Sequence, residues 1–477
     1  MSDTIDATPL PTPAAPQGFW STVREAIRGT QQDYTEGPIG RAIFLLAVPM
    51  VLEMVLESVF AVLDVFFVSK LGADAVAAVG ITESLMTIIY AVAIGLSMGA
   101  TATVARRIGE KDRDGAAVAA VQIIGLGVVF SLSLGVVGLL LAPKLLALLG
   151  ASPGVIAVGR GYAMLMLGGN ATVFLLYLIN AVFRGAGDAS IAMRVLWIGS
   201  AINIVLDPLL IFGIGPFPEL GVTGAAIGNN VGRGVAVLIQ LWTLARAKGG
   251  RIAIRREHLR LEPAVMGSIL RLSGTAILQV LVGTASWLGL IRILTRFGSS
   301  AVAGYTIGIR IIIFAILPSW GLSNAGATMV GQNLGAQKPE RAERAVWMAA
   351  FYNMLFLGSV GLVFIVLARP IIALFTSDPQ VSGYGVDCLR IISYGFVFYA
   401  YGMVLEQAFN GAGDTWTPTY INLACFWLWE IPLAYVLATR TGLGPRGVFI
   451  AITVAFSTLA VVCAILFKRG KWKQKKV

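Results

Sequence analysis

NAVFRGAGDAS at residues 180–190 and EQAFNGAGDTW at residues 406–416 share the pattern FxGAGD, 226 positions apart. Two further pairs of segments repeat at almost the same separation: LGADAVAA (71–78) with FGSSAVAG (297–304), and LGVTGAAI (220–227) with LGPRGVFI (443–450). Internal similarity at a fixed separation indicates a duplicated structural unit. The sequence therefore predicts two copies of one fold.

The composition places both copies in a membrane. The chain of 477 residues is 57% hydrophobic and only 13% charged, whereas soluble domains carry about 25% charged residues. A helix of about 20 apolar residues crosses a bilayer. Twelve such stretches occur, six in each copy, near residues 43–69, 80–104, 116–141, 157–181, 190–213, 221–245, 264–291, 300–328, 346–368, 385–408, 417–438 and 446–467. We expect an all-α integral membrane protein with twelve transmembrane helices.

The predicted organisation is two six-helix lobes, 41–246 and 264–467, with a basic cytoplasmic linker loop at 247–263. Residues 1–40 are predicted to be a disordered cytoplasmic tail, and residues 468–477 a basic cytoplasmic tail. An even number of spans per copy gives both lobes the same orientation, related by a pseudo-two-fold axis along the membrane normal. Such lobes enclose a central cavity and alternate its access between the two sides.

The charge distribution predicts the topology. Most Lys and Arg residues fall in the segments that share a side with both termini, which places the termini in the cytoplasm by the positive-inside rule. This asymmetry accounts for the net charge of +11 without a nucleic-acid partner. Membrane lipids are the expected surroundings, and a monomer is the simplest expectation.

The residues that support catalysis in other proteins are sparse here. Cys388, Cys425 and Cys463 lie far apart in apolar stretches, and the only histidine, His258, is in the basic linker. Neither a clustered metal site nor a histidine-based triad fits this distribution. We expect no enzyme activity and no cofactor.

Acidic residues within the spans are the candidate functional groups, because a carboxylate at mid-membrane depth costs a few kcal/mol. The first span carries Glu53, Glu57 and Asp64, which fall within about 40° of one another at 100° per residue. All three should face the protein interior. Glu53 and Glu57 form a secondary acidic face closer to the cytoplasm.

Depth groups Asp64 with a second set of polar residues. Asp64 lies five residues before the outer end of its span, and Asp207 lies six before the end of 190–213. Tyr162, Asn203 and Asn229 are predicted at the same level. Two carboxylates with amide and phenol partners suit a coupling cation, either H⁺ or a Na⁺ held by Asp64, Asn203, Asp207 and Asn229. The alternative interpretation is that these side chains only join helices by hydrogen bonds.

Pro208, next to Asp207, removes a backbone hydrogen bond and is predicted to let the helix bend. The second copy has leucine, Leu290 and Leu433, where the first has its two aspartates. Glu430 and Arg310 are interpreted as structural residues, for example ones that pair across helices. Arg233 is predicted to neutralise a glutamate of the first span.

Candidates for a substrate cavity between the lobes are Trp287, Tyr394, Tyr401 and Gln279. Aromatic faces attract organic cations, although aromatics at helical spacing are also ordinary packing residues.

The segments LDVFFVSKLGADAVAAVG (63–80) and NIVLDPLLIFGIGPFPELGVTGAAI (203–227), with the repeated FxGAGD, resemble the multidrug and toxic compound extrusion (MATE) transporters. The resemblance covers 41–467 and implies a V-shaped pair of bundles in a bacterial or archaeal cell (inner) membrane. It implies multidrug efflux of small organic, mostly cationic and amphipathic compounds in exchange for H⁺ or Na⁺. In prokaryotic members, cation-site residues fall on Asp64, Asn203 and Asp207, and a fourth-helix tyrosine on Tyr162.

Two departures from the family pattern stand out. Asn229 occupies a position where a threonine is common. Some members also carry a seventh-helix Glu and a tenth-helix Asp in the C-terminal lobe; here Gln279 is near the former region and the only tenth-span acid is Glu406 at its inner end, which argues against that variant. The alternative function is a lipid or lipid-linked oligosaccharide flippase of the same superfamily architecture. Flippases tend to have additional spans and a basic cavity, whereas the cavity predicted here is acidic.

Overall fold

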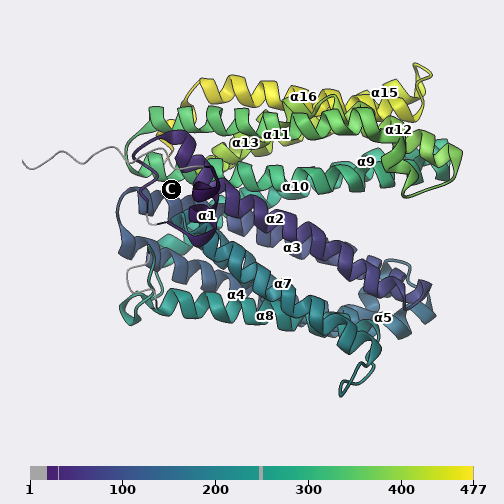
Figure 1. The fold of residues 1–477 in the computed structure, drawn as a ribbon, viewed down its shortest axis with the longest axis horizontal. Helices are drawn as coiled ribbons and strands as arrows, with labels where there is room; N and C mark the ends of the chain where they lie inside the picture. Colours follow the sequence, from purple (N-terminus) through teal and green to yellow (C-terminus); the bar gives the residue numbers. More distant parts are fainter. Residues whose placement is uncertain (1–18, 31, 247–250, 476–477) are drawn as a thin grey trace, which may run out of the picture.

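The computed structural model describes residues 19–30, 32–246 and 251–475, and these residues are almost entirely helical (Figure 1). The N-terminal lobe consists of α2 (Ile39–Ser69), α3 (Ala73–Gly109), α4 (Arg113–Leu148), α5 (Pro153–Gly168), α6 (Ala171–Ala186), α7 (Ala189–Phe212) and α8 (Val222–Arg246). The C-terminal lobe consists of α9 (Pro263–Leu294), α10 (Ser299–Gly335), α11 (Pro339–Ala373), α12 (Pro379–Ser393), α13 (Phe396–Gly411), α14 (Trp416–Asn422), the π-helix η3 (Leu423–Glu430), α15 (Ile431–Thr439) and α16 (Pro445–Lys468). Shorter helices flank the lobes: α1 (Phe19–Arg28), η1 (Arg256–His258), η2 (Thr295–Phe297) and η4 (Lys471–Gln474).

The predicted transmembrane helices are present in their predicted order. Among the described residues, 10 helical stretches are long and apolar enough to cross a membrane, and α12 with α13, bent by 59°, makes an eleventh. Helix α8 completes the set of twelve with its 25 residues, but Asn229, Asn230 and Arg233 make it less apolar. The all-α, twelve-helix fold class predicted from the sequence is confirmed.

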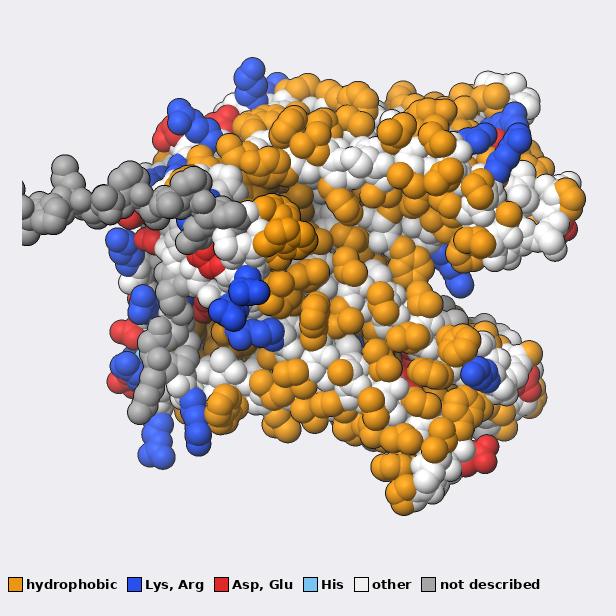
Figure 2. Space-filling view, in the orientation of Figure 1, with side chains coloured by type: hydrophobic (Ala, Val, Ile, Leu, Met, Phe, Trp, Pro, Cys, Tyr) orange, Lys and Arg blue, Asp and Glu red, His pale blue; other side chains and the backbone are white. Residues whose placement is uncertain are grey.

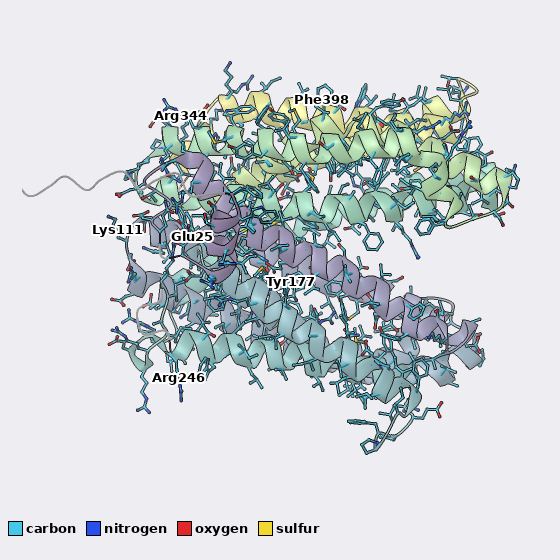
Figure 3. The ribbon with its side chains drawn as sticks, in the orientation of Figure 1. Glu25, Lys111, Tyr177, Arg246, Arg344 and Phe398 are labelled. Carbon is cyan, nitrogen blue, oxygen red and sulfur yellow. The ribbon has the colours of Figure 1, made fainter. Side chains whose placement is uncertain are left out.

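The two lobes form a V. Figure 1 shows them meeting at the end that holds the C-terminus and diverging toward the opposite end. The space-filling view shows a cleft between them at that opposite end, with apolar side chains along both flanks (Figure 2). Lys111, Arg246 and Arg344 lie at the closed end (Figure 3). The basic loops therefore gather where the lobes meet.

Glycines allow the lobes to meet closely, and they do so symmetrically. A Cβ on Gly95 of α3 would lie 2.5 Å from the backbone nitrogen of Ile277 in α9. Its counterpart 226 residues later, Gly321 of α10, would place a Cβ 2.6 Å from the carbonyl oxygen of Met50 in α2. At the closed end, Gly109 and Gly335 likewise leave no space for a side chain. The duplicated sequence thus builds the same close contact twice, α3 with α9 and α2 with α10, and we call these contacts the glycine seam.

The prediction that residues 1–40 are a disordered tail is wrong for the part that the structure describes. Residues 19–28 form α1, and Tyr34 is only 2% exposed. Residues 1–18 lie outside the described residues. The local sequence is polar and gives no periodic signal, so the order comes from contacts with distant parts of the chain.

Those contacts define an N-terminal strap, residues 32–37, that lies across the closed end. The Arg341 guanidinium donates hydrogen bonds to the carbonyl oxygens of Tyr34, Glu36 and Gly37, at 3.3, 2.9 and 2.8 Å. The Tyr34 hydroxyl donates to the carbonyl oxygen of Gly187 at 3.3 Å, and burial raises the pKa of Tyr34 to about 12. The strap therefore contacts both lobes.

Arg251 holds the strap from the linker. Its guanidinium lies 4.6 Å over the Tyr34 ring and 3.5 Å from the Asp188 carboxylate, and it is 7% exposed. Burial raises the pKa of Asp188 to about 6, although Arg251 acts in the opposite direction. Residues 247–250 of the predicted linker lie outside the described residues.

Candidate functional site: an acidic cavity in the N-terminal lobe

A cavity of about 440 Å³ lies inside the N-terminal lobe, between α2, α3, α5, α6, α7 and α8. Its apolar walls carry an unusual concentration of charge for a membrane interior. The charged residues that line it are Glu53, Glu57, Asp64, Glu83, Arg184 and Arg233. Acids outnumber bases, so the cavity attracts cations.

The five residues predicted to lie at one depth and to bind a coupling cation are brought together in the structure. We call this set the cation layer: Asp64, Tyr162, Asn203, Asp207 and Asn229. Asn229 Nδ2 donates a hydrogen bond to Asp64 Oδ1 at 3.4 Å, and Asn203 Nδ2 donates to Asp207 Oδ1 at 3.2 Å. The Asp64 and Asp207 carboxylates are close enough to repel one another. Tyr162 is fully buried with Asp64 among its electrostatic neighbours. Helices α2, α5, α7 and α8 each contribute to one cluster.

The packing around Asp207 depends on a glycine. Asp207 is 1% exposed, and a Cβ on Gly228 of α8 would lie less than 3.0 Å from its Oδ1 and 3.4 Å from Asn203 Nδ2. Gly228 therefore provides the space that the carboxylate occupies. The sequence GAAIGN places this glycine directly before Asn229, so one turn of α8 serves both aspartates.

The donor set matches a proton or an alkali cation. Asp64 and Asp207 supply carboxylate oxygens, and Asn203 Oδ1 is buried without a hydrogen-bonding partner in the part of the chain that the structure describes. Hard oxygen donors without thiolate or imidazole do not favour transition metals. The Nδ2 atom of the same Asn203 amide bonds Asp207, so the free Oδ1 is available to bind a cation next to Asp207.

Glu53 and Glu57 occupy separate surroundings within the cavity. Glu53 Oε1 accepts hydrogen bonds from Asn180 Nδ2 and from the Arg184 guanidinium, each at 3.1 Å. Glu57 Oε1 accepts one from the Tyr177 hydroxyl at 3.0 Å. Figure 3 shows Tyr177 in the N-terminal lobe, toward the place where the lobes meet. This secondary acidic face is therefore partly neutralised by a base.

The prediction that Arg233 neutralises a glutamate of the first span is wrong, because Arg184 of α6 does so instead. Arg184 and Glu53 form an ion pair in which the side chains are 12% and 2% exposed. Arg233 approaches the Tyr90 hydroxyl at 3.5 Å, with Glu83 as its acidic neighbour. The Arg233 side chain is long enough to reach several walls of the cavity. The depth of Arg233 in its span, which is all that the sequence gives, does not reveal which wall it contacts.

Sequence reasoning missed Glu83, Tyr90, Tyr177 and Arg184. Glu83 obeys the rule that identified Asp64, since it is an acid inside a predicted span, but it lies only three residues from the expected start at 80. Arg184 belongs to the FRGAGD segment, which lies between the predicted spans 157–181 and 190–213. The structure shows that α6 continues to Ala186, so Arg184 is still within a helix.

The four residues predicted to line a substrate cavity lie in four different surroundings. Trp287 lines a small cavity in the C-terminal lobe, whereas Tyr394 is 62% exposed. Tyr401 packs against Trp347, with ring centroids 6.3 Å apart. Gln279 is buried, and its amide donates to the Glu406 carboxylate at 2.7 Å. The predicted cavity is not assembled by this set.

The lobes do enclose a space where they meet. A cavity of about 110 Å³ is lined by Glu57, Tyr177 and Arg184 from the N-terminal lobe and by Trp320 and Asn410, among others, from the C-terminal lobe. It shares Glu57, Tyr177 and Arg184 with the acidic cavity, so the two are neighbours. A molecule between the lobes would therefore contact the secondary acidic face.

The prediction that Glu430 and Arg310 pair across helices is also wrong. Within the described residues, neither side chain forms an ion pair or a side-chain hydrogen bond. Arg310 is exposed, whereas Glu430 is 1% exposed at the end of η3. An acid buried without a base requires another explanation.

Comparison with known proteins places this architecture in a family. The sequence matches the family model described as MatE over residues 49–209 and 272–436. A probable multidrug resistance protein NorM from Thermotoga maritima is 28% identical over 444 residues, which cover 92% of this chain and 94% of that protein. An FAD transporter from Shewanella oneidensis is 27% identical over 441 residues, covering 91% of this chain and 95% of that protein.

A solved structure has the same arrangement of helices. The outward-facing conformation of a multidrug resistance MATE family transporter of the MOP superfamily matches with a TM-score of 0.86 at 26% identity, covering 92% of this chain and 98% of that one. The family model spans both lobes of the V, including α2 and α7, which carry Asp64 and Asp207. The chain therefore belongs to the MatE family of membrane transporters.

Proposed function

We propose that this protein is a multidrug antiporter that exports amphipathic organic cations in exchange for H⁺ or Na⁺. The observation that carries the proposal is the meeting of Asp64 and Asp207 with Asn203 and Asn229 inside the N-terminal lobe. Two neighbouring carboxylates in an apolar protein interior are stable only when a cation neutralises them. The relative from Thermotoga maritima, a probable multidrug resistance protein, supports drug export.

The proposed orientation follows from charge. The end where the lobes meet carries the basic loops, which the positive-inside rule assigns to the cytoplasm together with both termini. The cleft then opens to the outside, and a cation arriving from there reaches Asp64 and Asp207. In the inward-facing state, the glycine seam of α3 with α9 and α2 with α10 separates.

Coupling arises because the cation and the substrate compete for one charge environment. A cationic substrate near Glu57 and Asp64 is attracted while the carboxylates of the layer are free, and it loses this attraction when a cation neutralises them. Reciprocity requires that the substrate lower the affinity for the cation by the same factor. Pro208 next to Asp207 provides the place where α7 can bend as the charge state changes.

Transport into proteoliposomes tests this proposal. Vesicles preloaded with a fluorescent organic cation receive a pH gradient or a Na⁺ gradient in separate experiments, and release is followed by dequenching. Asp64→Asn and Asp207→Asn should each abolish gradient-driven movement. Asp74→Asn is the matched control, because Asp74 is an exposed acid in the first turn of α3. Full activity in either of the first two variants would overturn the assignment of the site.

A second candidate is export of an anionic or zwitterionic compound, favoured by Arg184 and Arg233 in the acidic cavity. The relative from Shewanella oneidensis is an FAD transporter, and a flavin dinucleotide carries a pyrophosphate that arginines recognise well. The same vesicles loaded with flavin adenine dinucleotide distinguish the two. Release that depends on Arg233, with no release of organic cations, would favour this second candidate.

A further inference from the structure

The C-terminal lobe contains a second, apolar cavity that corresponds to the acidic one. Its volume is about 50 Å³, and its walls come from α9, α10, α12, α13, η3 and α16. At the separations of 226 and 223, Leu290, Ile309 and Phe456 stand where the N-terminal lobe has Asp64, Glu83 and Arg233. All six residues line their respective cavities. The duplication therefore produced two equivalent cavities with opposite polarity.

One acid remains in this apolar cavity. Glu430 is 1% exposed and lines the cavity. No basic or amide side chain of the described residues bonds it. A carboxylate in such surroundings is stable only when it is protonated or when a cation neutralises it. The position of Glu430 is thus suited to a ligand that brings its own positive charge.

The backbone is irregular at this residue. Leu423–Glu430 form the π-helix η3, whereas the corresponding region of the first copy lies within the regular α-helix α7. A π-helical segment inserts an additional residue into a turn, and such segments occur often at functional sites. The wide turn ends at Glu430 and so sets the register in which this side chain meets the cavity.

Aromatic rings supply the rest of the surroundings. Trp287, Tyr305, Phe396 and Tyr399 line the same cavity as Glu430. Aromatic faces attract a diffuse cation, and this attraction reaches about 2 kcal/mol when the cation is desolvated. The Thr453 hydroxyl already donates within the lobe, to the carbonyl oxygen of Ile391 at 2.9 Å. A metal ion, which needs several oxygen ligands, would find too few here.

We propose that this cavity, with Glu430 as counter-ion, binds the ammonium end of a lipophilic organic cation. About 50 Å³ is space for roughly three to five water molecules at about 10–15 Å³ each, which fits a quaternary ammonium group and not a whole drug. The remainder of the molecule extends out of the cavity. The inference rests on the proposed function and adds a binding site for the ammonium group of the substrate in the C-terminal lobe, besides its attraction to the acidic cavity.

Direct binding tests the proposal, with benzyltrimethylammonium as the probe and titration calorimetry on detergent-purified protein. Neopentylbenzene, which has a carbon in place of the nitrogen, is the neutral control. Glu430→Gln should weaken binding of the ammonium at least tenfold and leave binding of the neutral compound unchanged. Equal ammonium affinity in wild type and Glu430→Gln would overturn the proposal.

A second variant keeps the test decisive if Glu430→Gln fails to fold. Leu290→Phe narrows the cavity while retaining the carboxylate, and it should also weaken ammonium binding at least tenfold. Unchanged affinity in a folded Leu290→Phe protein would overturn the proposal. Asp74→Asn should bind the ammonium as tightly as wild type, because Asp74 is an exposed acid in the first turn of α3, in the other lobe. Glu430-dependent binding without gradient-driven transport by the wild-type protein would refute the proposed antiport alone, whereas transport without Glu430-dependent binding would refute only this site.

Discussion

Gly228 offers a way to disturb the cation layer without removing any of its polar groups. A Cβ at this position would lie less than 3.0 Å from Asp207 Oδ1, a separation that Cβ atoms do not adopt, and 3.5 Å from the carboxylate carbon. The nearest oxygen must therefore retreat by roughly 1 Å to reach ordinary van der Waals contact. Asn203 bonds that same oxygen at 3.2 Å, so the amide must follow or lose its bond.

The magnitude follows from the cost of overpacking. Inserting one carbon into a closely packed site costs about 1–3 kcal/mol, which corresponds to roughly a 5- to 150-fold loss of affinity for the coupling cation. The change also replaces glycine by alanine within a helix, which favours the helical state by about 1 kcal/mol. Thermal stability of Gly228→Ala should therefore change little, while cation affinity falls.

The assay is gradient-driven release from proteoliposomes as a function of external Na⁺ concentration and of pH. Gly234→Ala is the matched control, because it makes the same substitution in α8 and its Cβ would meet only a Thr172 methyl at 3.9 Å. Gly228→Ala should shift the concentration for half-maximal release, and Gly234→Ala should not. Equal shifts in both, or none in Gly228→Ala, would refute the placement of the coupling site at Asp207.

Three further outcomes are expected. Gly109→Val should wedge the closed end of the seam against Gln332, so cysteines introduced on the outer cleft become less accessible to polar thiol reagents; unchanged accessibility would contradict the seam. Arg184→Met should lower stability by about 3–5 kcal/mol by leaving Glu53 buried without its base, and adding Glu53→Gln should restore most of it in thermal unfolding. Burial raises the pKa of Asp188 from 3.8 to about 6. Docking of the strap is therefore favoured while Asp188 is protonated, and this gain is lost as the pH rises through 6. Hydrogen exchange in residues 32–37, corrected for intrinsic rates, should slow as the pH falls below 6 in wild type but not in Asp188→Asn.

The grouping of Asp64 with Asp207 could be predicted because the geometry of a membrane-spanning helix gives two quantities directly from the sequence. Rise per residue gives depth, and 100° per residue gives the face, so Asp64 and Asp207 could be placed at one level. Whether two side chains at one level actually meet depends on helix packing. The structure settles that through Gly228, whose missing side chain leaves room for Asp207.

Predictions of ion pairs failed for a related reason. Arg233 and Arg184 both have side chains that reach several neighbouring helices, and their partners depend on rotation of α8 and α6 about their axes. The sequence supplies charges but not those rotations. The strap at 32–37 was missed because its partners, Arg251 and Arg341, are hundreds of residues away in the sequence, and no local sequence pattern indicates these contacts.

The two copies have diverged in charge while keeping their packing. At the separation of 226, Gln279 corresponds to Glu53, and Glu406 corresponds to Asn180. Each lobe therefore retains one acid hydrogen-bonded to one amide: Gln279 to Glu406 at 2.7 Å, and Asn180 to Glu53 at 3.1 Å. The acid and the amide have exchanged helices between the two lobes. Such an exchange preserves the bond and the volume but moves the negative charge from α2 to α13. The glycine seam tolerates no comparable change, because any side chain there would separate the lobes. The two copies could therefore diverge in their cavities alone: the N-terminal cavity is lined by Glu53, Glu57, Asp64 and Glu83, whereas the C-terminal cavity is lined mainly by aromatic and aliphatic side chains with one acid, Glu430.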